Sequence, residues 1–518
     1  MVPGLAADAV HQVKVDRVPF SHDFNRNEIE ILCFKTSFAL ATGLSAAAPG
    51  RILRNAVRIR SQGGFDMREL KKARRAIVGI VLAALFIVAP CGLAFADEIK
   101  AAEYALSCLN ISPGANASEL NFAWLTPKLG KTIVQMAKAT DKTSAEFPAD
   151  KAVSFSGSQA IVTATTFNTD DVTAPTGLFS NKVTVNGLAN STEYVYRVGD
   201  GSNWSDTYAV STRDPKAFGF LVVGDPQLGS KATGPKTLEA DTAGWTSLLN
   251  KATALYPDSS FMLSLGDQVN DYSDRAKQDA EYLTYFSPKQ LRSLPVATVD
   301  GNHDFAMGEY YGYHYNLPNL SSQYGVSYGN DGDYWFRYGN ALFLMLNSNT
   351  ESVYTHDLFI RDAVAKNPGT TWRIACFHHA IYSEADHVND PDIIDRRASY
   401  VPVLERYKID IVLMGHDHAY TRTFQMLGGK PQKTQVQDTS GTVINPTGIL
   451  YLTFNSGSGS KFYDWKNSSA PEAYSAARWQ GKVPSFGHIS ISGGVFTFTE
   501  YRADDMSVID SYSMIKTE

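Results

Sequence analysis

Five stretches of the sequence share one pattern, in which a short apolar run ends in a group of Asp, Asn, Gln or His residues. They are FGFLVVGDPQ (218–227), LSLGDQVND (263–271), VATVDGNHD (296–304), RIACFHHAIYS (373–383) and IVLMGHDHAYTR (411–422). Carboxylate and amide oxygens together with imidazole nitrogens are ligands for divalent metal ions. One such histidine is usually a satisfied core residue, but five strand ends carry too many polar groups to bury without a metal or ligand. The sequence therefore predicts a metal site built from five segments.

The apolar runs predict buried strands that alternate with helices. The segment after the first run places five apolar side chains on one helical face, and it leads into the run SFMLSL: Trp245, Leu248, Leu249, Ala252 and Leu255. Strand, helix and strand in this order indicate an α/β core, and open α/β sheets bind ligands beyond the carboxyl ends of their strands. After about residue 425, GILYLTF, SFGHISIS and GVFTFTEYRA predict strands that complete a sheet.

The region from 118 to 212 has a different pattern, with short alternating runs separated by polar turns. This pattern predicts a small antiparallel β-sandwich. Leu188 lies six residues before Tyr194 in LANSTEYVYRV, and this spacing resembles the tyrosine-corner strand of a fibronectin type III domain. The polar stretch STRDPKA (211–217) predicts a linker, so we expect a first domain over 97–213 and a second over 216–518.

The N-terminal part contains an export signal. Met67 begins a basic segment, an apolar run follows over 76–89, and Ala94-Phe95-Ala96 is a cleavage sequence. A membrane anchor is the alternative, but the run is shorter than the roughly 20 residues that span a bilayer. We expect a signal peptide over 67–96, cleavage after Ala96, and a secreted or cell-envelope protein whose mature chain has no stable membrane span. Residues 1–66 show no clear periodicity, so we expect a disordered upstream extension and a natural start at Met67.

The charge balance argues against nucleic acid as a partner. Residues 1–96 hold 13 Lys and Arg and 7 Asp and Glu, so their removal changes the formal net charge from −6 to −12. A chain this acidic disfavours nonspecific nucleic-acid binding. Cys108 and Cys376 alone remain after residue 96 and lie far apart in sequence, so we do not expect the fold to depend on a disulfide.

The order GD, GD, GNHD, H and GHDH resembles the calcineurin-like metallophosphoesterase superfamily, and above all its purple acid phosphatase branch. The resemblance covers most of residues 118–518 and includes YWFRYGNALFLMLNS and the closing strands. It implies an N-terminal fibronectin III-like β-sandwich followed by an α/β/β/α metallophosphoesterase sandwich. It also implies two metal ions as cofactors, which we expect to be divalent zinc, manganese, iron or calcium.

The resemblance also implies a role for individual residues. Asp267 matches the carboxylate that bridges both ions, Asp225 and His418 match ligands of the first ion, and the second ion takes Asn302, His378 and His416. His378 is preferred over its neighbour His379 because the histidine of the family lies four residues before a tyrosine, here Tyr382. His303 and His387 match catalytic histidines that face the substrate and either stabilise charge or protonate the leaving group.

The sequence departs from purple enzymes at two positions. Purple enzymes have a metal-binding tyrosine three residues after the bridging aspartate, where this chain has Asn270 and where Tyr272 is two residues too late. This loss argues against a ferric charge-transfer site. Gln227 stands where most other branches have histidine, and its side-chain oxygen either binds the first metal ion or takes part in a hydrogen bond beside it.

These residues predict an exported dinuclear metal-dependent phosphomonoesterase that uses a metal-bound hydroxide on a small-molecule phosphoester. The alternatives are a phosphodiesterase or nucleotide hydrolase of the same superfamily, and a surface-binding protein whose metal site is degenerate.

Three further features are predicted to have no catalytic role. GSKATGPKT (229–237) is close to a phosphate-binding P-loop, but Pro235 removes an N–H group from the cradle, so we expect a surface loop. The Gly/Ser-rich segment 455–461 is predicted to be a loop without a catalytic residue, and Arg422 is predicted to form a structural ion pair.

Overall fold

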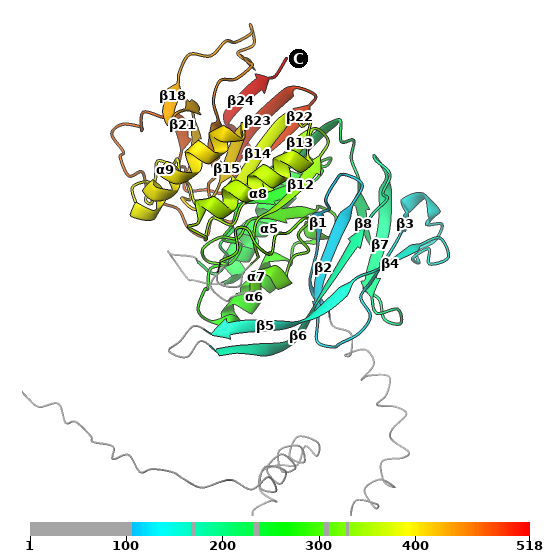
Figure 1. Cartoon of the computed structure of the whole chain (residues 1–518). Helices are drawn as coiled ribbons and strands as arrows, with labels where there is room; N and C mark the ends of the chain where they lie inside the picture. Colours follow the sequence, from blue (N-terminus) through cyan, green and yellow to red (C-terminus); the bar gives the residue numbers. More distant parts are fainter. Residues whose placement is uncertain (1–105, 167–171, 231–237, 305–309, 328–330, 518) are drawn as a thin grey trace, which may run out of the picture. The chain divides into compact units, whose positions relative to one another are not determined.

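The computed structural model describes residues 106–166, 172–230, 238–304, 310–327 and 331–517 (Figure 1). The expected upstream extension (1–66), the signal peptide (67–96) and most of the P-loop-like segment lie outside the described residues. Within the described part, a β-sandwich comes first and a larger four-layer domain follows it.

The N-terminal domain consists of two four-stranded antiparallel sheets, which confirms the predicted sandwich. The first sheet has the order β1 (Ser107–Pro113), β2 (Leu120–Thr126), β6 (Val172–Val185) and β5 (Ser158–Thr166). The second has the order β4 (Val153–Ser156), β3 (Ile133–Lys138), β7 (Glu193–Gly199) and β8 (Tyr208–Ser211). Side chains from both sheets bury each other; the rings of Phe122 on β2 and Tyr196 on β7 lie edge to face at 4.9 Å between centroids.

The tyrosine at the start of β7 forms the corner that its spacing suggested. The Tyr194 hydroxyl accepts a hydrogen bond from the backbone N–H of Ala189 at 2.9 Å, and Leu188 beside it is buried. This bond ties the turn before β7 to the strand itself. The closer relationship to fibronectin type III domains stays a prediction.

The second domain contains two seven-stranded sheets. The first has the order β11 (Val296–Thr298), β10 (Met262–Ser264), β9 (Ala217–Val223), β22 (Ser485–Ser492), β23 (Val495–Arg502), β24 (Val508–Ile515) and β19 (Val443–Ile444). The second has the order β12 (Tyr334–Tyr338), β13 (Ala341–Met345), β14 (Trp372–Phe377), β15 (Ile411–Met414), β20 (Leu450–Thr453), β16 (Tyr420–Thr423) and β21 (Ser475–Trp479). A short hairpin, β17 (Gln425–Leu427) and β18 (Lys430–Gln432), lies outside these sheets.

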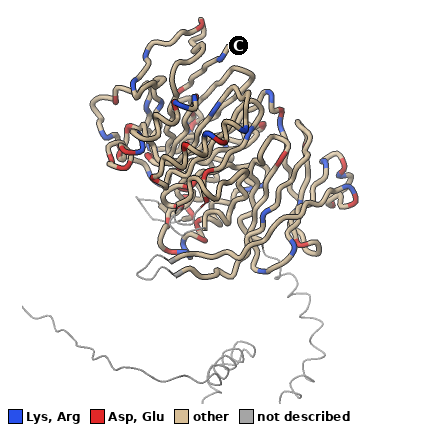
Figure 2. The backbone as a smooth tube through the Cα atoms, viewed as in Figure 1, with Lys and Arg blue, Asp and Glu red and all other residues tan. Residues whose placement is uncertain are grey.

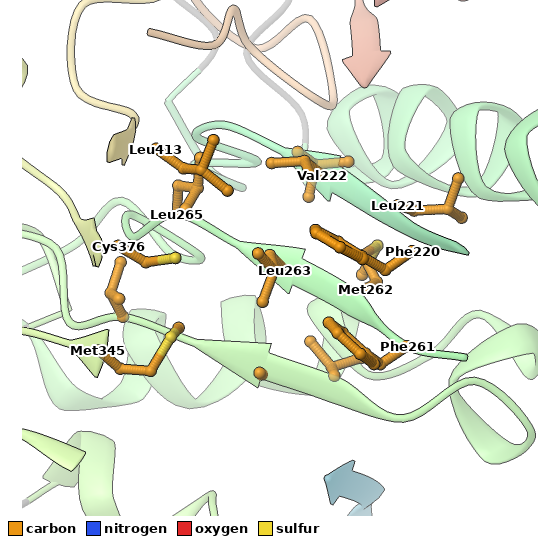
Figure 3. Close-up of a cluster of buried hydrophobic side chains, with 14 of the residues drawn as sticks. Phe220, Leu221, Val222, Phe261, Met262, Leu263, Leu265, Met345, Cys376 and Leu413 are labelled. Atoms are coloured by element: carbon orange, nitrogen blue, oxygen red, sulfur yellow. The ribbon is translucent and has the colours of Figure 1, made fainter. Parts of the chain in front are cut away.

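The strand sequences explain why the two sheets stack. Every residue of β13 is buried, because alternate side chains belong to two different cores. Phe343 and Met345 join the core between the sheets, whereas Leu342 and Leu344 join the core beneath the helices. Figure 3 shows the first of these cores, where Phe220 and Phe261 of one sheet lie opposite residues of the other sheet. The Phe220 ring packs at 4.9 Å from that of Phe261 and at 5.4 Å from that of Phe343, measured between centroids.

Helices cover the outer faces and complete an α/β/β/α sandwich, so the predicted fold class is confirmed. α8 (Val353–Lys366) and α9 (Pro391–Arg406) run over the second sheet, and α5 (Leu238–Leu255) and α6 (Arg275–Tyr285) accompany the first (Figure 1). The remaining helices are short: α7 (Tyr310–Tyr313), η2 (Ala139–Asp141) and η3 (Lys289–Arg292).

The predicted apolar face of α5 lies within one helix, and four of its five residues are buried: Trp245, Leu248, Leu249 and Ala252. Leu255 is 43% exposed. It is the last residue of the helix, where the chain turns away toward β10.

The two domains contact each other directly. Asn110 on β1 donates a side-chain hydrogen bond to the carbonyl of His314 at 2.8 Å, and the Tyr196 hydroxyl donates to the carbonyl of Arg292 at 2.8 Å.

Within the second domain, Arg422 pairs with Asp510 at 2.6 Å, which confirms the predicted structural ion pair and joins β16 of one sheet to β24 of the other.

The remaining global features concern thiols, membranes and charge. Within the described residues, Cys108 and Cys376 are both buried free thiols. No helix of the described ranges has the length and hydropathy needed to cross a membrane. Figure 2 shows basic and acidic residues interspersed along the described chain.

Candidate metal centre

Parallel strands bring the five polar segments to one edge. β9, β10 and β11 are parallel neighbours, and so are β14 and β15 in the other sheet. The carboxyl ends of parallel strands meet at the same edge of a sheet, so residues that directly follow these strands can converge there. Asp225 follows β9, Asp267 follows β10, Asn302 follows β11, His378 follows β14 and His416 follows β15.

The backbone at this edge adopts an unusual conformation. Five of the seven predicted metal ligands have positive φ angles, a region that residues other than glycine rarely occupy. They are Asp225 (36°), Gln227 (36°), Asp267 (46°), His416 (72°) and His418 (43°). Strain of this kind persists where the surrounding structure fixes it, and it is typical of functional sites. The left-handed turns redirect the chain after β9, β10 and β15.

Asp225, Asp267 and His378 form the centre of the site. Ligand atoms from these three buried residues all lie within 4.8 Å of one another. His378 Nε2 is 3.4 Å from Asp267 Oδ1, and His378 Nδ1 is 3.8 Å from Asp225 Oδ1. Burial raises the pKa of Asp225, and the charge of Asp267 raises it further. Two carboxylates held so close in a buried site favour a bound cation, which neutralises their repulsion.

The contacts of His378 test whether the residues fit a metal. Its Nδ1 atom lies 2.9 Å from the carbonyl oxygen of Leu265 and must donate there, so Nε2 carries a lone pair. Burial lowers the pKa of His378, which disfavours a second proton on the ring. Nevertheless Asn302 Oδ1 lies 2.9 Å from this Nε2 atom, so two electron pairs face each other. A metal ion that binds both atoms removes the conflict, and His416 Nδ1 lies 3.0 Å from the same nitrogen.

The opposite side of the site has a similar arrangement. His418 Nδ1 faces the carbonyl oxygen of Lys461 at 2.9 Å, which leaves Nε2 directed toward Asp225 Oδ1 at 3.7 Å. Burial lowers the pKa of His418 to about 3, so the ring is a neutral ligand at physiological pH. Gln227 is 1% exposed, and its Oε1 atom has no hydrogen-bond partner in the described part of the chain. A buried oxygen without a donor is suited to binding a hard cation.

The two predicted catalytic histidines lie beside the carboxylate cluster and outside it. His303 Nδ1 faces the carbonyl oxygen of Asn270, and its backbone N–H donates to Asp267 Oδ1 at 2.9 Å. His387 Nδ1 faces Asp390 Oδ2 at 2.7 Å, and its ring centroid is 4.5 Å from that of His416. Both rings are partly exposed, as groups that meet a substrate must be.

The structure separates the two candidates at the end of β14. His378 enters the cluster with the two aspartates. His379 instead engages Ser348 Oγ through Nδ1 at 2.8 Å, and its ring lies 4.8 Å from the ring of His416. This geometry supports His378 as the ligand and gives His379 a packing role.

Sequence reasoning missed Tyr463 and Lys461. The Tyr463 hydroxyl is 3.1 Å from His387 Nε2, and its ring is 5.1 Å from that of His418. Lys461 Nζ lies 4.5 Å from the centre of the Tyr463 ring and has no ion pair within the described ranges. Lys461 is the last residue of the Gly/Ser-rich segment 455–461, and Tyr463 follows that segment. Ser456 of the segment donates to the carbonyl of Asp225 at 3.1 Å. The run of glycines and serines directly after a predicted strand was the sequence feature that could have indicated Lys461 and Tyr463.

Comparisons with known proteins identify both domains of the chain. The family model for the calcineurin-like phosphoesterase matches residues 218–420, and that for the purple acid phosphatase N-terminal domain matches residues 107–212. An uncharacterized protein of Mycobacterium tuberculosis is 24% identical over 389 residues, 68% of this chain and 69% of that protein. Acid phosphatase type 7 of Danio rerio is 22% identical over 381 residues, 65% of this chain and 78% of that protein.

One solved structure resembles the whole described fold. Purple acid phosphatase PPD1 from yellow lupin (Lupinus luteus) seeds superposes with a TM-score of 0.62, over 80% of this chain and 75% of that one. The sequence identity is 15%, so the likeness concerns the fold.

Proposed function

Since this chain belongs to the calcineurin-like phosphoesterases and carries the N-terminal domain of purple acid phosphatases, we propose that it hydrolyses phosphomonoesters with two divalent metal ions. One observation carries the proposal. The oxygen of Asn302 and the unprotonated nitrogen of His378 face each other at 2.9 Å beside two buried carboxylates. Metal ions bound between these groups satisfy all of them at once.

The residues divide into two sets of ligands. Asp225, Gln227 and His418 would hold the first ion, and Asn302, His378 and His416 the second. Asp267, whose carboxylate lies near His378 and at the junction of both sets, would bridge them. When bound, two divalent ions activate water for in-line attack on phosphorus and neutralise charge on the phosphoryl oxygens.

His387 is suited to protonating the leaving group. Asp390 accepts a hydrogen bond from its Nδ1 atom and orients the ring, so that a proton on Nε2 points toward the Tyr463 hydroxyl. When the bond between phosphorus and the ester oxygen breaks, this proton passes to the departing alkoxide. Asp417 supports the position of His387, because its Oδ1 atom accepts the backbone N–H of His387 at 3.0 Å.

His303 and Lys461 are suited to binding the phosphate group. The Asn270 carbonyl fixes Nδ1 of His303 and leaves Nε2 available to a phosphate oxygen. Burial and the charge of Asp267 raise the pKa of Asp225, whereas the positive charge of Lys461 lowers it. Lys461 therefore acts electrostatically on the centre. A cation that forms no ion pair with any described residue and lies beside such a site attracts a phosphate dianion.

The test compares a monoester with a diester. Metal-loaded protein should hydrolyse p-nitrophenyl phosphate faster than bis-p-nitrophenyl phosphate, and Asp267→Asn should abolish both activities because it removes the bridging carboxylate. The matched control is Asp258→Asn, which changes an aspartate whose side chain is 86% exposed. A faster diester reaction would favour the phosphodiesterase, and Asp267→Asn activity within a few-fold of wild type would refute the dinuclear mechanism.

Export is a further part of the proposal, and it rests on the sequence of residues 67–96. Expression from Met67 should give the same secreted product as expression of the full sequence, with an N-terminus at Asp97. N-terminal sequencing of the secreted protein tests this. If only the longer form is secreted and it keeps residues 1–66, the assignment of the start is wrong.

A further inference from the structure

A small cavity lies near the end of β11, and none of the proposed metal ligands lines it. It has room for about one water-sized sphere, 10 Å³. Its lining contains two carboxylates and no Lys, Arg or His among the described residues: Val299, Asp300, Tyr311, Leu317, Asp331, Gly332, Tyr334, Met345, Leu346 and Asn347. Asp300 is 4% exposed, and neither of its carboxylate oxygens has a hydrogen-bond partner within the described ranges.

Asp304, four residues later in the same loop, is a buried carboxylate whose oxygens do accept hydrogen bonds. Its Oδ2 atom accepts the N–H of Gly301 at 3.0 Å, and its Oδ1 atom accepts the N–H of Gln268 at 3.1 Å and the hydroxyl of Tyr282 at 3.3 Å. Asp300 has none of these donors. A buried carboxylate is strongly destabilising unless a hydrogen-bond donor or a cation compensates for its lost hydration.

The polar groups around Asp300 are occupied elsewhere. The Tyr334 hydroxyl donates to the carbonyl oxygen of Thr298 at 2.6 Å, and the Tyr311 hydroxyl pairs with the Thr298 hydroxyl at 2.5 Å. The Asn347 amide donates to the carbonyl oxygen of Asp331 at 2.9 Å. The side chains nearest to Asp300 therefore leave it without a donor, while the second carboxylate, Asp331, lines the same cavity.

We propose that Asp300 and Asp331 hold a third, structural cation of the Ca²⁺ type in this cavity. The two carboxylates favour a hard cation, and the absence of His and Cys from the described lining disfavours zinc. The ion joins the loop that carries Asn302 and His303 to the segment before β12, so it stabilises the position of the catalytic loop.

The experiment uses the purified full chain, with the catalytic centre loaded with zinc, and measures Ca²⁺ bound per chain together with the melting temperature. Wild type should bind one Ca²⁺ and melt several degrees higher with it. Asp300→Asn and Asp331→Asn should lose both effects. Asp267→Asn should keep both, because it damages the catalytic centre and leaves the cavity intact.

The melting temperature of the metal-free protein gives a second test, in which Asp300→Asn should have the opposite effect. Asp300→Asn replaces an uncompensated carboxylate with a neutral amide, so without Ca²⁺ the variant should melt above wild type, and with Ca²⁺ below it. Wild type that binds no Ca²⁺ beyond the catalytic centre would overturn the proposal. So would an Asp300→Asn or Asp331→Asn protein with an unchanged Ca²⁺ response. If Asp300→Asn fails to fold, the wild-type titration and Asp331→Asn decide the question.

Discussion

Gln227 has two possible roles, as a ligand of the first metal ion or as a hydrogen-bonding residue beside it. Its side-chain oxygen is buried and accepts no hydrogen bond from any described residue, and its backbone N–H donates to the carbonyl oxygen of Asp267 at 2.7 Å. A buried carbonyl oxygen without a donor destabilises a protein by about 1–3 kcal/mol. A hydrogen-bonding role would require a donor near this oxygen, whereas a metal ligand requires that none be present. The structure therefore favours Gln227 as a ligand of the first ion.

Gln227→Ala should weaken loading of the first metal site more than loading of the second, because it removes a ligand from the first site alone. Elemental analysis after dialysis at limiting metal should show a loss that approaches one of the two ions. Gln323→Ala, at an exposed position, is the control. Full occupancy of both sites in Gln227→Ala would leave Gln227 without a role as a ligand.

Lys461→Gln should raise KM for a phosphomonoester about tenfold, since a charge-assisted hydrogen bond to phosphate contributes about 1.5–3 kcal/mol. Steady-state kinetics test this, and the effect should shrink at high salt. Lys482→Gln is the matched control, because Lys482 pairs with Asp464 at 2.8 Å, and the side chains are 60% and 81% exposed. Equal kinetics for both variants would remove Lys461 from the phosphate site.

At the scale of elements, α6 supports the loop that follows β10. Glu281 on this helix accepts the backbone N–H groups of Asn270 at 2.9 Å and Asp271 at 2.7 Å. Asn270 in turn presents its carbonyl to His303. The helix thus positions His303, the proposed phosphate-binding histidine, through two successive sets of hydrogen bonds. Burial raises the pKa of Glu281 to about 7, from an ordinary value of 4.5.

This raised pKa makes a prediction about stability. Between pH 4.5 and 7 the folded protein keeps a proton on Glu281 that the unfolded chain releases. The free energy of unfolding therefore falls through this window as pH rises, by on the order of 2 kcal/mol from this group. Glu281→Gln should lack that part of the fall, whereas exposed Glu239→Gln should keep it. Urea unfolding at pH 5 and pH 8 measures the difference, and parallel curves for wild type and Glu281→Gln would contradict it.

The sequence predicts this fold well where local pattern and tertiary structure agree. β13 and β15 of the second sheet are apolar at every position, and the polar residues after β9, β10, β11, β14 and β15 converge at one edge. Tyr463 could not be predicted, because its partner His387 lies 76 residues away and the loop has no periodicity. The cavity around Asp300 and Asp331 could not be predicted from the sequence either. Whether the Asp300 carboxylate has a hydrogen-bond donor depends on how the side chains pack in the folded protein.

At the scale of the whole molecule, the two stacked sheets hold a strained site in place. Positive φ angles at five predicted ligands destabilise the fold by about 1–3 kcal/mol each. The core between the sheets, which includes Phe220, Phe261 and Phe343, offsets this strain through buried apolar area. The site therefore depends on both sheets, because each contributes part of the ligand set.

The charge of the proposed ligands favours divalent metal ions. Asp225 and Asp267 contribute two negative charges, and the proposed amide and imidazole ligands are neutral. Two divalent ions leave the cluster at +2, which suits a phosphate dianion. A ferric ion would add a charge that no tyrosinate offsets, because Asn270 stands where purple enzymes have tyrosine and Tyr272 is 55% exposed.

The most direct measurement combines the metal content of the purified protein with its visible spectrum. We predict two divalent ions per chain in the catalytic centre, a colourless solution, and loss of both ions together with activity in Asp267→Asn. An iron-phenolate absorption band in wild type would contradict this account and would point to Tyr463 as the metal ligand. One ion per chain in an active wild-type protein would contradict the dinuclear centre itself.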